Sequence, residues 1–248
     1  MATAPAHPGS LTQSPPGRRF DHFFFTSMSI VMLATVFAGF ARTYFLAGMV
    51  RAPLPSLIIH IHGAAFTAWI LLLVAQSSLV AAHRVDIHRR LGIAGCLLGC
   101  LMVVLGVMAA TDSLARSAGA PGRDAKAFYI VPLTDMLIFG TVLFFAYRGR
   151  RRPTEHKRLI YIATTALLIA AIARLPVAFL YRQPSIAALL SYSFLLALVA
   201  YDLWSTRKVH PATLWAGGFL IFIQQVRFPI SQTAAWHAFA TWVLALVT

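Results

Sequence analysis

The chain has 248 residues, of which 59% are hydrophobic and only 11% are charged, and its formal net charge is +14. Soluble domains carry about 25% charged residues, so this composition excludes an ordinary soluble protein and predicts an integral membrane protein. The Lys and Arg residues fall in short clusters between apolar stretches rather than along one polar face, which argues against nucleic-acid binding and favours topology signals.

The first residues of the chain predict a disordered tail. They are rich in Pro, Gly, Ser and Thr and contain no apolar core of the kind that a cleavable signal needs. We therefore expect a disordered cytoplasmic tail over residues 1–20, a membrane domain over residues 21–230, and a C-terminal segment over residues 231–248.

Seven apolar stretches follow the tail, and each is long enough for a transmembrane helix, which needs about 20 mainly apolar residues. The shorter segment Ala234–Val247 carries Trp236, His237 and Trp242 and predicts a helix at the membrane interface. The predicted fold class is all-α: a polytopic membrane helix bundle of seven transmembrane helices plus a short C-terminal interfacial helix. The predicted spans are residues 22–45, 55–82, 91–111, 128–147, 158–180, 186–204 and 211–228.

The distribution of positive charge predicts the orientation of the bundle. The tail and the second, fourth and sixth connections carry 13 Lys and Arg residues, whereas the other side carries eight, of which Arg42 and Arg174 fall within predicted spans. Because cytoplasmic loops are enriched in Lys and Arg, the N-terminus is predicted to lie in the cytoplasm and the C-terminus outside.

Several polar residues within the spans share one predicted depth. At a rise of about 1.5 Å per residue they lie roughly 5 to 10 Å below the outer interface. Ionisable side chains at this depth cost about 2.5 to 3.5 kcal/mol, so they normally face the bundle interior and pair with each other. We expect Asp135 to pair with Arg174, either as a structural lock between two spans or as part of a binding site. The predicted site consists of His60, His62, Asp135, Arg174, Gln224, Gln225 and Arg227.

The two neighbouring histidines cannot both enter this site, because residues two apart on a helix point about 200° apart. His60 shares its face with small residues such as Gly63, and we expect it to face the bundle. His62 shares its face with bulky residues such as Trp69. Each histidine is either a hydrogen-bonded packing residue or a ligand.

A second candidate lies on the cytoplasmic side, where His88, His156 and His210 stand at the starts of three spans. Neutral imidazoles at one level could bind a metal ion. Polar residues also gather at helix starts because the first N–H groups need partners. The sequence leaves a metal site and helix capping as alternatives.

The most concrete ligand for the outer site is a redox cofactor, haem b or a quinone, with a histidine as ligand or proton carrier and Arg174 as an anchor for an anionic group. A haem held by two histidines needs them on different helices, whereas His60 and His62 share one. The alternatives are a small-solute transporter and a non-catalytic assembly or scaffold subunit. The expected partners are the lipid bilayer and a small molecule, with no nucleic acid, and the sequence does not determine enzymatic activity or oligomeric state.

Three motifs resemble a known group of proteins. They are the His-bearing span around His60, the sequence IHRRLG that ends at Gly92, and EHKRLIYIATTALLIAAIARLP, which ends at Pro176. Together they resemble bacterial multi-pass membrane proteins defined only by a domain of unknown function, which implies a bacterial inner-membrane location. The opening from His88 to Gly92 is also similar to di-haem cytochromes of the b561 type, although the paired in-span histidines of that family are missing here.

Overall fold

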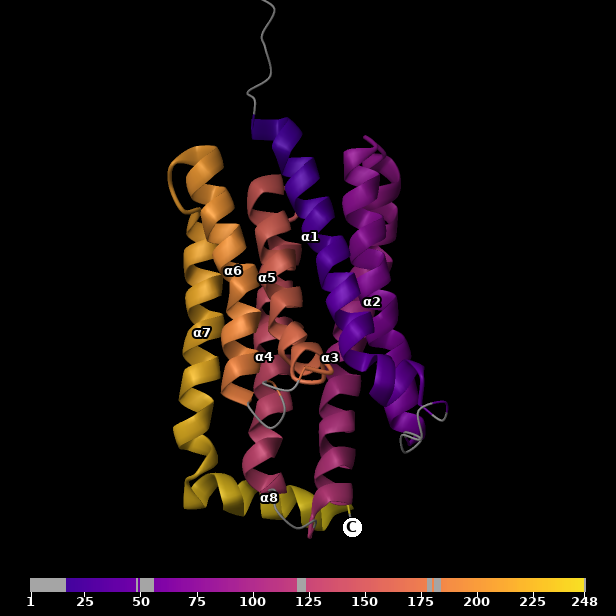
Figure 1. The fold of residues 1–248 in the computed structure, drawn as a ribbon, viewed down its shortest axis with the longest axis vertical. Helices are drawn as coiled ribbons and strands as arrows, with labels where there is room; N and C mark the ends of the chain where they lie inside the picture. The colour runs from indigo at the N-terminus through magenta and orange to yellow at the C-terminus, as the bar shows by residue number, and fades with distance from the viewer. Residues whose placement is uncertain are drawn as a thin grey trace, which may run out of the picture.

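Seven long helices run side by side with alternating direction, and an eighth lies across one end (Figure 1). The computed structural model describes residues 17–47, 49, 56–119, 124–177, 180 and 184–247, and no strand occurs among them. The predicted tail lies mostly outside these residues, and α1 already begins at Gly17. The helices are α1 (Gly17–Phe40), the π-helix η1 (Ala41–Phe45), α2 (Leu57–Ala81), α3 (Val85–Ser117), α4 (Ala125–Arg148), α5 (Pro153–Ile172), α6 (Pro184–Thr206), α7 (Pro211–Ser231) and α8 (Ala234–Val247).

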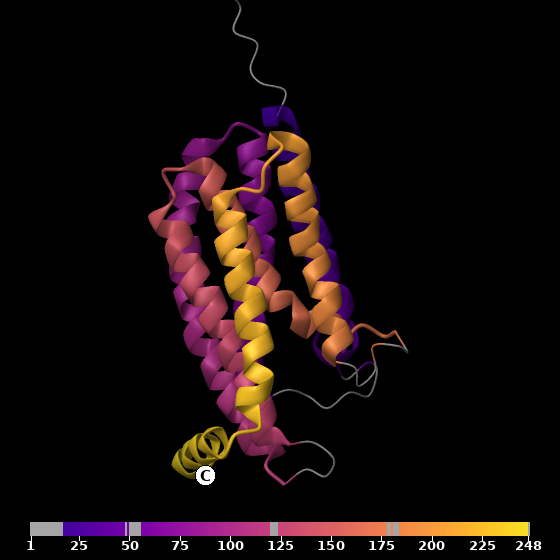
Figure 2. The same ribbon diagram turned by 90° about the vertical axis from the view of Figure 1, so that its left-hand side faces the viewer.

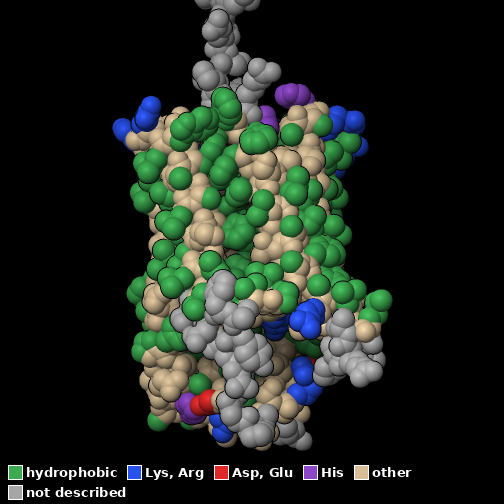
Figure 3. Space-filling model, viewed as in Figure 1, with side chains coloured by type: hydrophobic (Ala, Val, Ile, Leu, Met, Phe, Trp, Pro, Cys, Tyr) green, Lys and Arg blue, Asp and Glu red, His purple; other side chains and the backbone are tan. Residues whose placement is uncertain are grey.

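The two ends of the bundle differ. Helices α1, α3, α5 and α7 begin at what we call the N-terminal end, and α8 covers part of the other, which we call the α8 end (Figure 1). Hydrophobic side chains cover the middle of the face seen in Figure 3, and Lys and Arg side chains lie towards both of its ends. This distribution is that of a helical membrane protein.

Five helical segments are long and apolar enough to cross a membrane: α1 with η1, α2, α3, α4 and α6. The pair α7 and α8 passes the same test together, although an 86° bend separates the two helices. Polar residues near the end of α7, including Arg227, make that helix less apolar, and the start of α5 carries Glu155, Lys157 and Arg158. Length and composition therefore support five or six spans, and the predicted count of seven is not reproduced.

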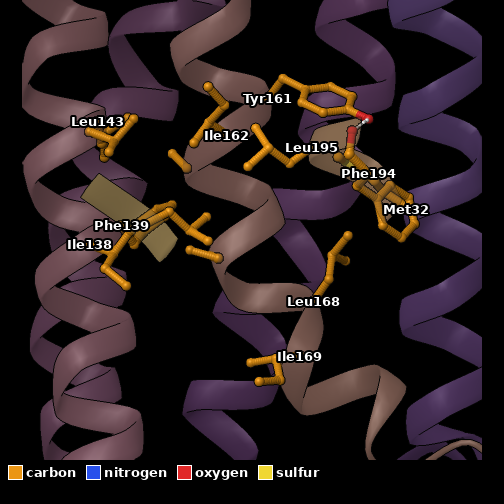
Figure 4. Packing of buried hydrophobic residues seen from close by; sticks show 14 of the residues in the cluster. Met32, Ile138, Phe139, Leu143, Tyr161, Ile162, Leu168, Ile169, Phe194 and Leu195 are labelled. Atoms are coloured by element: carbon orange, nitrogen blue, oxygen red, sulfur yellow. Dashed lines mark hydrogen bonds between the residues drawn. The ribbon is translucent and has the colours of Figure 1, made fainter. Parts of the chain in front are cut away.

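Helix α5 forms the centre of the bundle and packs against α1, α4, α6 and α7. Side chains from these helices meet in one apolar layer, in which Ile162 and Leu168 of α5 lie near Phe139 of α4 and Met32 of α1 (Figure 4). The hydroxyl of Tyr161 donates a hydrogen bond to a backbone carbonyl of α6 at 2.9 Å. Because lipid is as apolar as these side chains, close packing rather than water exclusion holds such a core together.

Glycines allow the helices to approach closely. A Cβ atom on Gly39 of α1 would clash with the backbone of Ala171 on α5, so the two helices cross in backbone contact. On α3, a Cβ on Gly95 would lie 3.0 Å from Leu72 of α2, and one on Gly99 would clash with a side chain of α4. The glycine face of α3 is therefore in contact with two neighbouring helices.

Helix α8 lies across the ends of α3 and α4 (Figures 1 and 2). Ala240 is fully buried against a small cluster that includes Leu114 and Tyr129, and the indole of Trp236 donates a hydrogen bond to the carbonyl of Lys126 at 2.8 Å. The opposite side of α8 exposes large apolar side chains, among them Trp242. One side of α8 is thus fixed to the bundle and the other is free of it.

Candidate functional site

A buried ion pair joins α4 to α7 near the α8 end. Arg227 donates from Nη1 to the Oδ1 atom of Asp135 at 2.8 Å, and the two residues are 2% and 6% exposed. The same nitrogen lies 3.4 Å from the hydroxyl of Thr134. Since a charge deep in a membrane bundle needs a partner, this pair fixes the rotation of α7 relative to α4.

Beside the ion pair lies a buried amide without hydrogen bonds. Gln224 stands three residues before Arg227 on the same face of α7 and neighbours the Asp135 carboxylate. It is only 1% exposed; its amide lies beside the Asp135 carboxylate, but neither amide atom makes a hydrogen bond of regular geometry among the described residues, and neither does Nε of Arg227. We call Thr134, Asp135, Gln224 and Arg227 the α4–α7 cluster. It holds donors and an acceptor that the described part of the chain does not use.

Arg174 is not part of this cluster, so the predicted pair of Asp135 with Arg174 is wrong. Because α5 ends at Ile172, Arg174 follows the last helical turn and is exposed. Its Nη1 atom donates to the carbonyl of Ala170 at 2.7 Å, and its guanidinium lies over the ring of Phe40 on α1. The partner of Asp135 is Arg227 of α7.

The two histidines of α2 also differ from the prediction. Tyr44 of η1 lies over Gly63 and donates a hydrogen bond to the carbonyl of His60 at 3.2 Å, so it fills the small-residue face. His60 is exposed, whereas His62 is half-buried and packs on Phe66. The expectation that His60 faces the bundle is therefore wrong, and His62 is the one turned inward. Its Nδ1 atom is buried without a hydrogen-bond partner in the described ranges.

Gln225 lies on the other side of α7 from Gln224. It is exposed, and its amide donates to the hydroxyl of Tyr192 on α6 at 3.1 Å. The structure thus brings together three of the seven predicted residues, which are Asp135, Gln224 and Arg227, and places the other four elsewhere.

At the N-terminal end, two of the three predicted metal ligands meet. The ring centres of His88 and His156 lie 6.3 Å apart. His210 instead caps α7, because its Nδ1 atom accepts the N–H of Ala212 at 3.1 Å. Burial and the nearby positive charge of Arg158 lower the pKa of His210, which keeps the neutral ring available as a cap. Within the described ranges, no three His, Cys, Asp or Glu residues form a group that could hold a metal ion.

The sequence reasoning missed a buried polar centre at this end. Asp202 of α6 is fully buried and accepts hydrogen bonds from both Nε and Nη2 of Arg158, at 2.9 and 2.5 Å. It also accepts from the hydroxyl of Thr213 at 2.6 Å and from the backbone N–H of His210 at 3.0 Å. The charge count places Arg158 in the fourth connection, whereas its side chain is buried in the bundle. The available signal was Asp202 itself, a lone carboxylate in an apolar stretch, which requires a cation nearby.

A second ion pair extends this centre to α1. Lys157 of α5 lies 2.6 Å from the Asp21 carboxylate, which also accepts a hydrogen bond from the hydroxyl of Tyr201 on α6. Four helices are therefore joined by polar contacts at the N-terminal end. Both carboxylate oxygens of Asp202 already accept hydrogen bonds from the protein. This centre is therefore less suited to binding a ligand than the α4–α7 cluster.

The resemblance based on the IHRRLG and EHKRL motifs stays a prediction. Comparison with family models, with curated proteins and with solved structures gave no match to this chain.

Proposed function

We propose that this chain is a seven-span protein of the bacterial inner membrane, with a cytoplasmic N-terminus, whose α4–α7 cluster binds a small, mainly apolar molecule with a polar head group. A quinone is the most suitable class. The observation that carries the proposal is the amide of Gln224, which is 1% exposed and, beside the Asp135 carboxylate, makes no hydrogen bond of regular geometry among the described residues.

The unused hydrogen-bonding atoms favour a binding site over a purely structural lock. A lock between α4 and α7 needs only Asp135 and Arg227, which already form an ion pair through Nη1 and Oδ1. Leaving the Gln224 amide unpaired costs about 1 to 3 kcal/mol, and the membrane offers no water to relieve it. A carbonyl oxygen of a ligand can accept from Gln224 and from Nε of Arg227, and a hydroxyl can donate to the amide oxygen. Quinone and quinol supply these groups.

Haem fits the same region less well. His62 is the only histidine of α2 that is turned inward, and a second axial histidine would have to come from another helix. Apart from His60 on the same helix, the other described histidines lie at the N-terminal end of the bundle or, as His237, on α8, where it faces Asp124. The geometry therefore favours a quinone over a haem held by two histidines.

The burial of the polar residues supports α5 and α7 as spans in addition to the five apolar ones. Gln224 and Arg227 of α7 and Arg158 of α5 are turned into the bundle and away from lipid. A helix with such residues can cross a membrane when other helices surround it. Lys and Arg at the N-terminal end, among them Arg89 and Arg151, support a cytoplasmic position for that end.

Two adjacent glutamines provide a matched test. Gln224→Leu removes the buried amide with little change of shape, and Gln225→Leu removes an exposed one. Purified proteins would be extracted with organic solvent for mass spectrometry, and their melting temperatures measured with and without decylubiquinone. Wild type and Gln225→Leu should gain stability, by about 2.7 kcal/mol at 100 times the dissociation constant. Gln224→Leu should be stabilised much less by decylubiquinone, and its extract should contain no quinone.

The opposite result is equally clear. Equal stabilisation of all three proteins would place the quinone elsewhere. No quinone in the extracts and no shift for wild type would reject the quinone assignment, and greater stability of ligand-free Gln224→Leu would then identify the amide as a structural defect.

A further inference from the structure

The outward side of α7 is uncovered. Figure 2 shows α7 in front of the bundle, and no helix from the described part of the chain lies over it. The exposed residues of this side include five whose spacing alternates between four and three: Leu214, Gly218, Ile221, Gln225 and Phe228. Positions that advance by 3.5 residues on average form one narrow line along a helix, as in a coiled coil. We call these five residues the α7 seam.

The α7 seam is poorly suited to lipid. A Cβ atom on Gly218 would meet no atom within 4 Å, so the space in front of this glycine is open. Gln225 places an amide on the same line, about 9 Å before the end of α7 at Ser231. The exposed side of α3, by contrast, presents large apolar residues such as Ile93 and Leu97. The composition of the α7 seam is that of a contact between helices rather than of a lipid-facing surface.

The amide of Gln225 is only partly satisfied. Its nitrogen donates to the hydroxyl of Tyr192 on α6 at 3.1 Å. An amide has two N–H groups and an acceptor oxygen, so one N–H and the oxygen make no hydrogen bond among the described residues. The exposed hydroxyl of Ser193 differs, because it donates to the carbonyl of Leu190 within its own helix at 2.6 Å. Lipid offers the remaining groups of Gln225 no partner.

We propose that the α7 seam binds a second copy of this chain and that the two Gln225 amides donate to each other across the interface. This inference rests on α7 crossing the membrane, as proposed above, and not on quinone binding. Two copies inserted in the same orientation are related by a two-fold axis along the membrane normal, so their α7 helices run parallel. Each residue of the α7 seam then faces the same residue of the second copy.

A second copy suits the α7 seam because an amide is self-complementary. The remaining N–H of each Gln225 donates to the amide oxygen of the other, so that each amide uses both N–H groups and its oxygen. Gly218 lets the two backbones approach, as small residues do between helices in membranes. The α7 seam contains no charged residue and therefore needs no oppositely charged partner. A single polar position in such a line also fixes the register of the two helices.

Disulfide cross-linking maps the interface. In a background with Cys96→Ala and Cys100→Ala, Gly218→Cys and Ile221→Cys should form covalent dimers when native membranes are oxidised with copper phenanthroline. Leu97→Cys on α3 is the control, because Leu97 is 68% exposed but lies outside the α7 seam. It should stay monomeric. Equal cross-linking of all three variants would indicate random collision and would overturn the proposal, as would dimers of Leu97→Cys alone.

The part played by the amide is tested by energy transfer between labelled copies in liposomes, at increasing dilution with lipid. Gln225→Leu should raise the dissociation constant of the dimer about 10-fold, which corresponds to ~1.4 kcal/mol. Ser193→Ala, which removes a hydroxyl already bonded within its own helix, should leave the constant unchanged. An unchanged constant for Gln225→Leu, or an equal rise for Ser193→Ala, overturns the pairing of the amides.

The two proposals fail separately. Wild-type protein that is monomeric at every dilution, yet is stabilised by decylubiquinone, rejects the dimer and leaves the quinone site standing. Dimers that cross-link through Gly218→Cys, in protein that decylubiquinone does not stabilise, reject the quinone site alone. Gln225→Leu should lose affinity for the second copy while it keeps its stabilisation by decylubiquinone, because Gln225 lies outside the α4–α7 cluster.

Discussion

At the scale of single residues, the most buried charges of this chain have their partners on other helices. Asp135 of α4 meets Arg227 of α7, three helices later in the chain, and Asp202 of α6 meets Arg158 of the preceding helix α5. Breaking such a pair leaves one uncompensated charge in a medium that cannot solvate it, whereas removing both members does not. Substituting one member of such a pair should therefore destabilise the protein much more than substituting both members.

The ion pair of α4 and α7 gives a direct prediction. Asp135→Leu alone should destabilise the protein by about 3 to 5 kcal/mol, because Arg227 remains buried and unpaired. Asp135→Leu combined with Arg227→Met should recover most of this loss. The measurement is unfolding by heat or SDS in detergent micelles. Asp112→Ala, which breaks the more exposed pair with Arg116, should cost no more than about 1 kcal/mol.

Equal losses in the single and double variants would contradict this prediction. Such a result would mean that the shape of the two side chains, rather than their charge, matters to the packing of α4 on α7. A double variant that is stable but no longer binds quinone would support the binding site of which the pair is a part.

At the scale of helices, the crossing of α1 and α5 depends on one glycine. Gly39→Ala would place a methyl group against the backbone of Ala171, which cannot move aside as a side chain can. We expect a loss of about 1 to 3 kcal/mol, the usual cost of overpacking, in the same unfolding measurement. Gly218→Ala on α7 is the control, because no atom lies within 4 Å of the added methyl. It should gain up to about 1 kcal/mol from better helix propensity.

An unchanged stability of Gly39→Ala would contradict the close crossing of α1 and α5. If Gly218→Ala lost as much stability as Gly39→Ala, the loss would be a general effect of substituting a helical glycine and would not report on the contact of α1 with α5.

The helices themselves were largely predictable, because apolar stretches in a membrane protein have few alternatives to a helix. The stretch 55–82 became α2, Leu57–Ala81, and the stretch 186–204 became α6, Pro184–Thr206. Helix α3 is longer than the predicted 91–111, since its ends carry charged residues such as Arg89 that continue a helix without being apolar. Helix α5 is shorter than predicted and ends at Ile172, whose carbonyl the ring of Pro176 would clash with if the helix continued.

The candidate site was predictable only in part, because an apolar pattern gives the depth of a residue and not the rotation of its helix. Asp135 and Arg174 lie on consecutive spans, which made their pairing reasonable, but Asp135 faces α7. In the same way, the small residues beside His60 suggested a pocket, and Tyr44 fills that space. Both errors concern which helix is the neighbour, and that depends on packing between segments distant in sequence.

At the scale of the whole molecule, the bundle has one strongly cationic end. Exposed arginines at the N-terminal end include Arg84, Arg89, Arg90 and Arg151. The turn between α7 and α8 at the other end, around Thr233, has no Lys or Arg. The positive-inside rule then predicts that the N-terminal end faces the cytoplasm, and this prediction can be tested from both sides.

Single cysteines at the two ends report the orientation. In a background with Cys96→Ala and Cys100→Ala, Thr233→Cys should react with a membrane-impermeant maleimide on intact spheroplasts. Arg151→Cys should react only after the membrane has been permeabilised. The reverse pattern would place the N-terminus outside, and labelling of both sites on intact spheroplasts would mean that the number of spans between them is even.

The Asp202 centre also has a consequence for how the chain enters the membrane during synthesis. If α5 crosses the bilayer as proposed, its buried Arg158 reaches the translocon before its carboxylate partner, which lies 44 residues later on α6. An arginine without its partner costs about 2.5 to 3.5 kcal/mol at the centre of an inserting helix, and part of this cost at the position of Arg158 near the start of α5. Helix α5 should therefore wait at the translocon until α6 and α7 have been made, and the three helices should be released into the bilayer as one unit.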